Sequence, residues 1–193
     1  MWFNNFLLLS LLIIIPPKSS SSLIDLVSSL IIYEDGVNSK GICVPYINTL
    51  KYPTIGYGEV CKFEKVQKLV EAKKACSSYT QDCDEQKAKQ WLRNTIVNRI
   101  LCIQNKDNIK NAFNKAFKFR RAILVSLAFQ LGCNNLAKYE DFLSYMAKGD
   151  WARAADEMFN FNWATELQDR IKRYSYVIKN NKCKDFCQNY GWN

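Results

Sequence analysis

The chain has 193 residues, of which 27 are Lys or Arg, 18 are Asp or Glu and none is His. The absence of histidine excludes Ser-His-Asp and Cys-His nucleophiles, a histidine base and histidine metal ligands, so acid–base chemistry must use carboxylates, Lys, Tyr or Cys. The formal net charge of +9 favours an anionic partner of one of three kinds: nucleic acid, a membrane surface, or an acidic polymer such as bacterial cell wall.

The first 21 residues have the pattern of a secretory signal peptide. An apolar run from Phe6 to Ile15 is too short to span a bilayer, and small residues follow at Ser19 to Ser22. We therefore expect residues 22–193 to form a single domain that is secreted, or delivered to a lysosome or phagosome after entering the secretory pathway.

Eight cysteines follow the signal segment, and an even number in a secreted chain predicts up to four disulfides. They are Cys43, Cys61, Cys76, Cys83, Cys102, Cys133, Cys183 and Cys187. We expect Cys43 to pair with Cys61 around one loop, and Cys102 with Cys133 across two helices. Because histidine and Cys-x-x-Cys pairs are both absent, we expect no metal site and no cofactor.

The mature chain begins with a helical pattern and continues with a hairpin pattern. Apolar residues recur at helical spacing from Leu23 to Ile31, with Ser22 as N-cap, Asp25 in a capping box and Gly36 at the end. Residues 42–60 are rich in β-branched and aromatic side chains and contain Pro, Gly and Asn at turn positions, which predicts a small hairpin sheet.

The rest of the chain has the periodicity of successive helices, so the sequence predicts an α+β fold that is mainly α. We expect a hairpin lobe at about 36–62 and a helical lobe at about 63–193. The segment 121–131 is nearly all apolar and predicts a central buried helix. The helices are expected at 84–103, 109–117, 121–131, 139–148, 151–160 and 165–179.

Several short motifs stand in a distinctive order along the chain. They are Tyr33-Glu34-Asp35-Gly36, Tyr46-x-Asn48, Thr54-Ile55-Gly56-Tyr57-Gly58, Leu127–Gly132, Gly149–Ala155 and Asp169–Arg173. This set resembles the phage-type lysozymes (glycoside hydrolase family 24), whose pattern is an aromatic-Glu-Gly helix end, then Tyr-x-Asp, then Thr-Ile-Gly-Tyr-Gly. The resemblance covers most of the mature chain and implies a lysozyme-like fold.

The resemblance also implies hydrolysis of the β-1,4 bond between N-acetylmuramic acid and N-acetylglucosamine in bacterial peptidoglycan. This reaction needs a carboxylic acid that protonates the leaving oxygen and a polar group that holds the attacking water. By resemblance, Glu34 is the acid and Thr54 holds the water, while Arg170 pairs with the acid. Gln130 contacts sugar, and Gly58 keeps the floor of the cleft free of side chains.

Three positions depart from the family pattern. Asp35 stands between Glu34 and Gly36, so alignment on the glycine would make Asp35 the acid, whereas alignment on Tyr33 favours Glu34. Asn48 occupies the position of the family Asp, and an amide cannot act as a base. Glu59 stands where the family usually has His.

Three hypotheses for function follow. The first is a monomeric lysozyme that acts on peptidoglycan in antibacterial defence or bacterial digestion, with no nucleic-acid partner and no stable membrane insertion. The second, suggested by Asn48, is a catalytically impaired protein that binds peptidoglycan or chitooligosaccharide. The third is a basic, membrane-active antimicrobial protein whose effect needs no hydrolysis.

Overall fold

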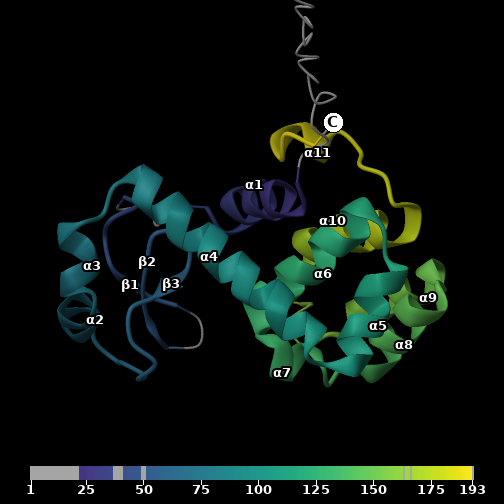
Figure 1. Ribbon diagram of the computed structural model, residues 1–193, viewed down its shortest axis with the longest axis horizontal. Coiled ribbons are helices and arrows are strands. Elements are labelled where there is room, and N and C mark those ends of the chain that lie inside the picture. Colours follow the sequence, from purple (N-terminus) through teal and green to yellow (C-terminus); the bar gives the residue numbers. More distant parts are fainter. Residues whose placement is uncertain (1–21, 37–40, 49–50, 163, 166, 193) are drawn as a thin grey trace, which may run out of the picture.

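A long helix, α4 (Glu85–Gln104), joins two lobes of unequal size (Figure 1). The computed structural model describes residues 22–36, 41–48, 51–162, 164–165 and 167–192. The smaller lobe contains the sheet, and the larger lobe is helical. The mainly helical α+β class and the lysozyme-like arrangement are confirmed. The predicted signal segment lies outside the described residues.

Helix α1 (Leu23–Asp35) begins and ends as the sequence predicts. Ser22 and Asp25 form a reciprocal capping box, and Gly36 ends the helix with φ +61°, a conformation that strains other residues. The buried side chains of α1 lie on one face, which packs against α4 and against α6 (Lys118–Leu131). This packing holds the acidic end of α1 in place relative to the helical lobe.

The predicted hairpin is an antiparallel sheet of three short strands within the described residues. The strands are β1 (Tyr46–Ile47), β2 (Pro53–Ile55) and β3 (Glu59–Val60), with β2 in the middle. Thr54 lies opposite Tyr46 on one side and Val60 on the other. Side chains of directly paired residues project to the same face of a sheet, so Tyr46 and Thr54 share a face.

Two short helices, α2 (Leu69–Ala75) and α3 (Ser77–Gln81), lie with the sheet in the smaller lobe (Figure 1). Disulfides Cys43–Cys83 and Cys61–Cys76 tie this lobe together. The expected pair Cys43–Cys61 is therefore wrong, because each of these cysteines bonds a residue from the helical segment that covers the sheet.

The larger lobe contains the remaining helices. The residues expected at 151–160 form a helix that continues as a 3-10 turn, and the last long helix begins at residue 168, not 165. The elements are α5 (Asp107–Lys115), α6, α7 (Cys133–Leu136), α8 (Glu140–Lys148), α9 (Trp151–Glu157), η1 (Met158–Asn160), α10 (Gln168–Asn180) and α11 (Phe186–Asn189).

Helix α6 is the centre of this lobe, as its apolar sequence predicts, because its residues from Ala122 to Ala128 are all buried. The expected disulfide Cys102–Cys133 is confirmed, and Cys183–Cys187 joins α11 to the segment that precedes it. Phe117 does not extend α5 as expected: it precedes α6 and is 68% exposed. In the described part of the chain, no helix has both the length and the apolar composition needed to cross a membrane.

Candidate active site at the end of α1

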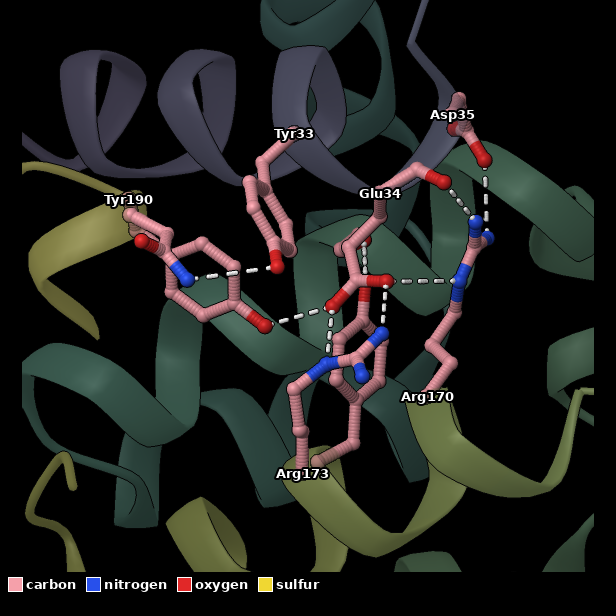
Figure 2. Close-up of polar contacts among 9 residues, drawn as sticks. Tyr33, Glu34, Asp35, Arg170, Arg173 and Tyr190 are labelled. Atoms are coloured by element: carbon pink, nitrogen blue, oxygen red, sulfur yellow. Dashed lines mark hydrogen bonds and ion pairs between the residues drawn. The ribbon is translucent and has the colours of Figure 1, made fainter. Parts of the chain in front are cut away.

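Helix α1 ends in two neighbouring carboxylates, Glu34 and Asp35, whose side chains point in different directions (Figure 2). Successive helical residues project about 100° apart around the axis, so two adjacent acids cannot face the same surroundings. Glu34 points toward Arg170 and Arg173 of α10 and toward Tyr190 after α11, whereas Asp35 points toward Arg170 alone. The two acids therefore have different contacts and different chemistry.

The carboxylate of Glu34 is enclosed by hydrogen-bond donors, and its side chain is 2% exposed. Its Oε1 accepts from Nε of Arg173 at 2.9 Å and from the hydroxyl of Tyr190. Its Oε2 accepts from Nη2 of Arg173 at 2.6 Å and from Nε of Arg170 at 3.2 Å. With two donors on each oxygen, Glu34 links α1 to α10 and to the C-terminal segment (Figure 2).

Asp35 has one charged partner and keeps 32% of its side chain exposed. Its Oδ1 lies 2.8 Å from Nη1 of Arg170. Burial raises the pKa of the Asp35 carboxyl, and the negative charge of Glu34 adds to this rise, although Arg170 opposes it. Asp35 is thus a carboxyl with a raised pKa whose side chain is partly open to solvent.

Arg170 bridges the two acids from the first turn of α10. Its guanidinium contacts Oε2 of Glu34 and Oδ1 of Asp35, and its Nη2 donates to the main-chain carbonyl of Glu34. The side chain is 9% exposed, so it supplies a buried positive charge that also closes the carboxyl end of α1. The predicted pairing of Arg170 with the acid is present, and it involves both carboxylates.

The hairpin contributes Tyr46 to the surroundings of Asp35. Burial raises the pKa of Tyr46 to about 12, and the negative charge of Asp35 contributes to the rise. Thr54 is paired with Tyr46 and so lies on the same face of the sheet. Asp35 and the hairpin are therefore close enough to interact electrostatically.

Asn48 and Thr54 are held by short contacts within the hairpin. Oδ1 of Asn48 accepts from the main-chain N–H of Tyr52 at 3.0 Å, so the amide stabilises the turn between β1 and β2. The Thr54 hydroxyl donates to the carbonyl of Tyr52 at 3.0 Å, and the residue is fully buried. Thr54 lies in β2 and Asn48 directly follows β1, and the polar atoms of both side chains bond within the hairpin in the described conformation.

Gly58 and Gln130 lie where the smaller lobe meets α6. A Cβ atom on Gly58 would be 2.8 Å from Cζ of Phe129, and the residue has φ +107°, so only glycine fits without strain. Gln130 follows Phe129 on α6, and its Nε2 is buried with no hydrogen-bond partner among the described residues. Such an orphaned donor suits a ligand that offers an acceptor.

Glu59 belongs to a separate contact between the lobes. Its Oε2 accepts from the hydroxyl of Thr95 on α4 at 3.1 Å. Burial raises the pKa of Glu59, while the bond from Thr95 and the charge of Arg99 partly oppose the rise. Glu59 therefore faces α4 and is not part of the Glu34–Asp35 cluster.

A cavity of about 420 Å³ opens at the first turn of α10, beside the carboxylate cluster. Its lining is mostly polar, with amide, hydroxyl and charged groups that can hydrogen-bond sugar hydroxyls. Among the residues that the structure describes, no cluster of His, Cys, Asp or Glu is arranged to hold a metal ion. The cavity is lined by Glu34, Thr165, Leu167, Gln168, Asp169, Arg170 and Arg173.

Sequence reasoning missed three members of this site. Arg173 has a detectable signal, because it follows Arg170 by three positions and so lies on the same face of α10. Tyr46 belongs to a quoted motif but was given no role. Tyr190 has no local signal, since it lies 156 positions from Glu34.

The fold and the paired carboxylates define a lysozyme-like protein. The chain belongs to the phage lysozyme family, whose model matches residues 39–174. This match begins after α1 and ends before α11, so neither Glu34 and Asp35 nor Tyr190 lies within it.

Three curated proteins illustrate the similarity. The chain is 27% identical over 84 residues to probable T4-type lysozyme 2 of Dictyostelium discoideum, covering 44% of this chain and 49% of the relative. It is 26% identical over 77 residues to probable T4-type lysozyme 1 of the same organism, covering 40% and 45%. It is 22% identical over 141 residues to the pre-baseplate central spike protein Gp5 of Enterobacteria phage T4, covering 69% and 24%. The chain thus spans about half of each Dictyostelium relative and a quarter of the phage protein.

Proposed function

We propose that this protein is a lysozyme that hydrolyses the β-1,4 bond between N-acetylmuramic acid and N-acetylglucosamine in peptidoglycan, with Asp35 as the proton donor. The observation that carries the proposal is the contrast between the two acids. Asp35 is partly exposed, has a raised pKa and lies near Tyr46 of the hairpin, whereas Glu34 is 2% exposed and its two carboxylate oxygens already accept four hydrogen bonds. Family membership supports the reaction class.

The reaction begins when Asp35 transfers its proton to the glycosidic oxygen, which leaves as an alcohol as the bond to the anomeric carbon breaks. A water molecule attacks that carbon and then loses a proton to bulk water. Thr54 accepts a hydrogen bond from this water, because its own proton is directed to Tyr52. Thr54 is fully buried in the described conformation, so its hydroxyl must become accessible before it can contact this water.

Arg170 has two functions in this scheme. It stabilises the carboxylate that Asp35 becomes after proton transfer, because Nη1 already lies 2.8 Å from Oδ1. It also lines the cavity on α10, where Gln168 and Thr165 offer hydrogen bonds to sugar. The positive net charge draws the protein toward an anionic cell wall.

The setting that fits this activity is outside the cytosol. Four disulfides join all eight cysteines, and such bonds persist in oxidising compartments. The proposal therefore includes secretion, or delivery to a lysosome or phagosome, and a role in antibacterial defence or digestion of bacteria as a monomer.

The test measures reducing N-acetylmuramic acid ends released from purified peptidoglycan by wild type, Asp35→Asn and Glu34→Gln. We expect Asp35→Asn to lose about 10²–10⁴-fold in rate with an unchanged circular dichroism spectrum. Glu34→Gln is expected to keep more activity than Asp35→Asn, and to unfold at a lower temperature than wild type because it removes a buried charge from its partners.

Two results would contradict the assignment. Wild-type activity in Asp35→Asn would remove Asp35 from the reaction. A folded Glu34→Gln with no activity, beside an active Asp35→Asn, would return the acid to Glu34 as the motif alignment on Tyr33 predicts.

A second candidate function is binding of peptidoglycan without efficient hydrolysis. It is favoured by Asn48, because no carboxylate occurs in the sequence between Asp35 and Glu59 to activate water. Co-sedimentation with peptidoglycan without release of reducing ends would support it. Asn48→Asp keeps the acceptor for Tyr52 and adds a charge, so hydrolysis that appears only in this variant would also support it. Hydrolysis by the wild type would end this candidate, and leakage of liposomes by Asp35→Asn would instead indicate a membrane-active protein.

A further inference from the structure

The C-terminal segment folds back onto the helix that carries the acids. We call residues 183–192 the C-terminal cap; it contains the Cys183–Cys187 disulfide and α11, which lies beside α1 in Figure 1. Trp192 is 4% exposed, and its indole N–H donates to the carbonyl of Leu26 at 3.0 Å and to Oγ of Ser29 at 3.1 Å. The cap is therefore attached along the length of α1.

Tyr190 attaches the cap to the acidic end of α1. Tyr190 is 2% exposed, and its ring lies edge-on to that of Tyr33 with 5.0 Å between the ring centroids. Its hydroxyl donates a hydrogen bond to Oε1 of Glu34 (Figure 2). Burial and the bond to Glu34 raise the pKa of Tyr190, so the hydroxyl keeps its proton and remains a donor. Asn189 adds a second contact, from Nδ2 to the hydroxyl of Tyr33 at 3.3 Å.

Glu34 transmits this contact to Asp35 through a shared arginine. Oε1 of Glu34 is held by Tyr190 and Arg173, and its Oε2 binds Nε of Arg170. The same guanidinium binds Asp35 through Nη1. A planar guanidinium moves as one body, so any change in its hold on Glu34 changes its position at Asp35.

We propose that Tyr190 and Glu34 are positioning residues, and that the C-terminal cap acts through them and Arg170 to orient Asp35 and set its charge balance. This inference rests on the proposed function in taking Asp35 as the acid. Both partners of the contact, Tyr190 and Glu34, lie outside the residues that match the family model.

The test compares Tyr190→Phe with the matched control Tyr176→Phe. Both changes delete one phenol hydroxyl from the layer of rings around Phe186, but Tyr176 contacts Phe186 and Lys184 and lies outside the hydrogen-bond network of Glu34. We expect Tyr190→Phe to lower kcat about tenfold with KM within about twofold of wild type, because it disturbs the acid and not the sugar contacts. Tyr176→Phe is expected to match wild type.

The pH profile separates positioning from mere stability. Without the Tyr190 hydroxyl, Glu34 keeps more uncompensated charge and draws Arg170 away from Asp35, so both effects raise the pKa of Asp35. The alkaline limb of kcat/KM, where the acid loses its proton, then moves to higher pH. Glu34→Gln removes the charge and releases Arg170 to Asp35, so its alkaline limb moves to lower pH.

A second measurement does not depend on activity. The carboxyl ¹³C shift of Asp35, followed by NMR titration, should show the same opposite displacements in Tyr190→Phe and Glu34→Gln. Opposite displacements in a protein that releases no sugar would support the positioning role of the cap but would contradict the proposed function. Two results would overturn the proposed role of the cap. One is an active wild type in which the Asp35 carboxyl titrates alike in Tyr190→Phe and Glu34→Gln. The other is a Tyr190→Phe variant that equals Tyr176→Phe in kcat and in the titration of Asp35.

Discussion

The two halves of the site are built in different ways. On the hairpin, Asn48 and Thr54 bond to Tyr52, four and two positions away. At the end of α1, Glu34 bonds to Arg170, Arg173 and Tyr190. These residues lie 136, 139 and 156 positions further along the chain. The hairpin half can form as soon as its own turn forms, whereas the acidic half exists only when both ends of the chain have folded together.

The halves also differ in charge. The segment between Gly36 and Gly58 contains no carboxylate, and its charged residues are Lys40 and Lys51. The α1 half concentrates two acids and two arginines in a nearly closed space. Removing the partner of a buried charge lowers the free energy of unfolding more than removing the partner of a neutral group does. Substitutions in the acidic half should therefore destabilise the protein more than substitutions in the hairpin half.

The largest expected effect comes from Arg170→Met. It keeps the length and apolar stem of the side chain but removes the charge that both acids contact, leaving Asp35 without its ion-pair partner. We expect a loss of about 3–5 kcal/mol in the free energy of unfolding, measured with guanidinium chloride, together with loss of hydrolysis.

Lys172→Met is the matched control for this change. Lys172 lies on the same helix, its side chain is 63% exposed and its ion pair with Asp169 is 3.5 Å long. Lys172→Met should lower the free energy of unfolding by about 0.5 kcal/mol or less. Equal losses in the two variants would show that the buried cluster is no more sensitive than the surface.

A smaller effect is expected where the hairpin meets α6. Gly58→Ala places a Cβ 2.8 Å from Cζ of Phe129 and also requires a positive φ, so we expect a loss of about 2–4 kcal/mol in thermal or chemical unfolding. Gly132→Ala shares the positive φ but meets no atom within 4 Å, and therefore isolates the contribution of the clash. If Gly58→Ala were no worse than Gly132→Ala, close packing against Phe129 would not constrain this position.

The smallest expected effect concerns pH and Glu59. Burial raises its folded pKa above the unfolded value, so its contribution to stability is complete below about pH 4 and is lost as the pH rises through the folded pKa. Glu59→Gln keeps an acceptor for Thr95 but cannot ionise. The variant should therefore gain stability relative to wild type between pH 4 and pH 7, as measured by urea unfolding at both values. A difference that stays constant between the two pH values would contradict this prediction.

Local chemistry in the sequence determined much of the fold. Ser22, Asp25 and Gly36 delimit α1 through contacts within a few residues, and the apolar run of α6 predicts its burial at the centre of the larger lobe. The hairpin follows from its turn residues and glycines. Each of these features depends on short-range backbone geometry or on hydrophobic burial, which a sequence pattern displays directly.

Only the tertiary structure determined the disulfide partner of Cys43 and the different environments of Glu34 and Asp35. Two adjacent acids look alike in a sequence, and the motif points to either one. Their environments differ because the helix turns about 100° between them, which directs Glu34 to Arg173 and Tyr190 and leaves Asp35 beside the hairpin. Those partners come from the far end of the chain, so only the folded protein brings them to α1.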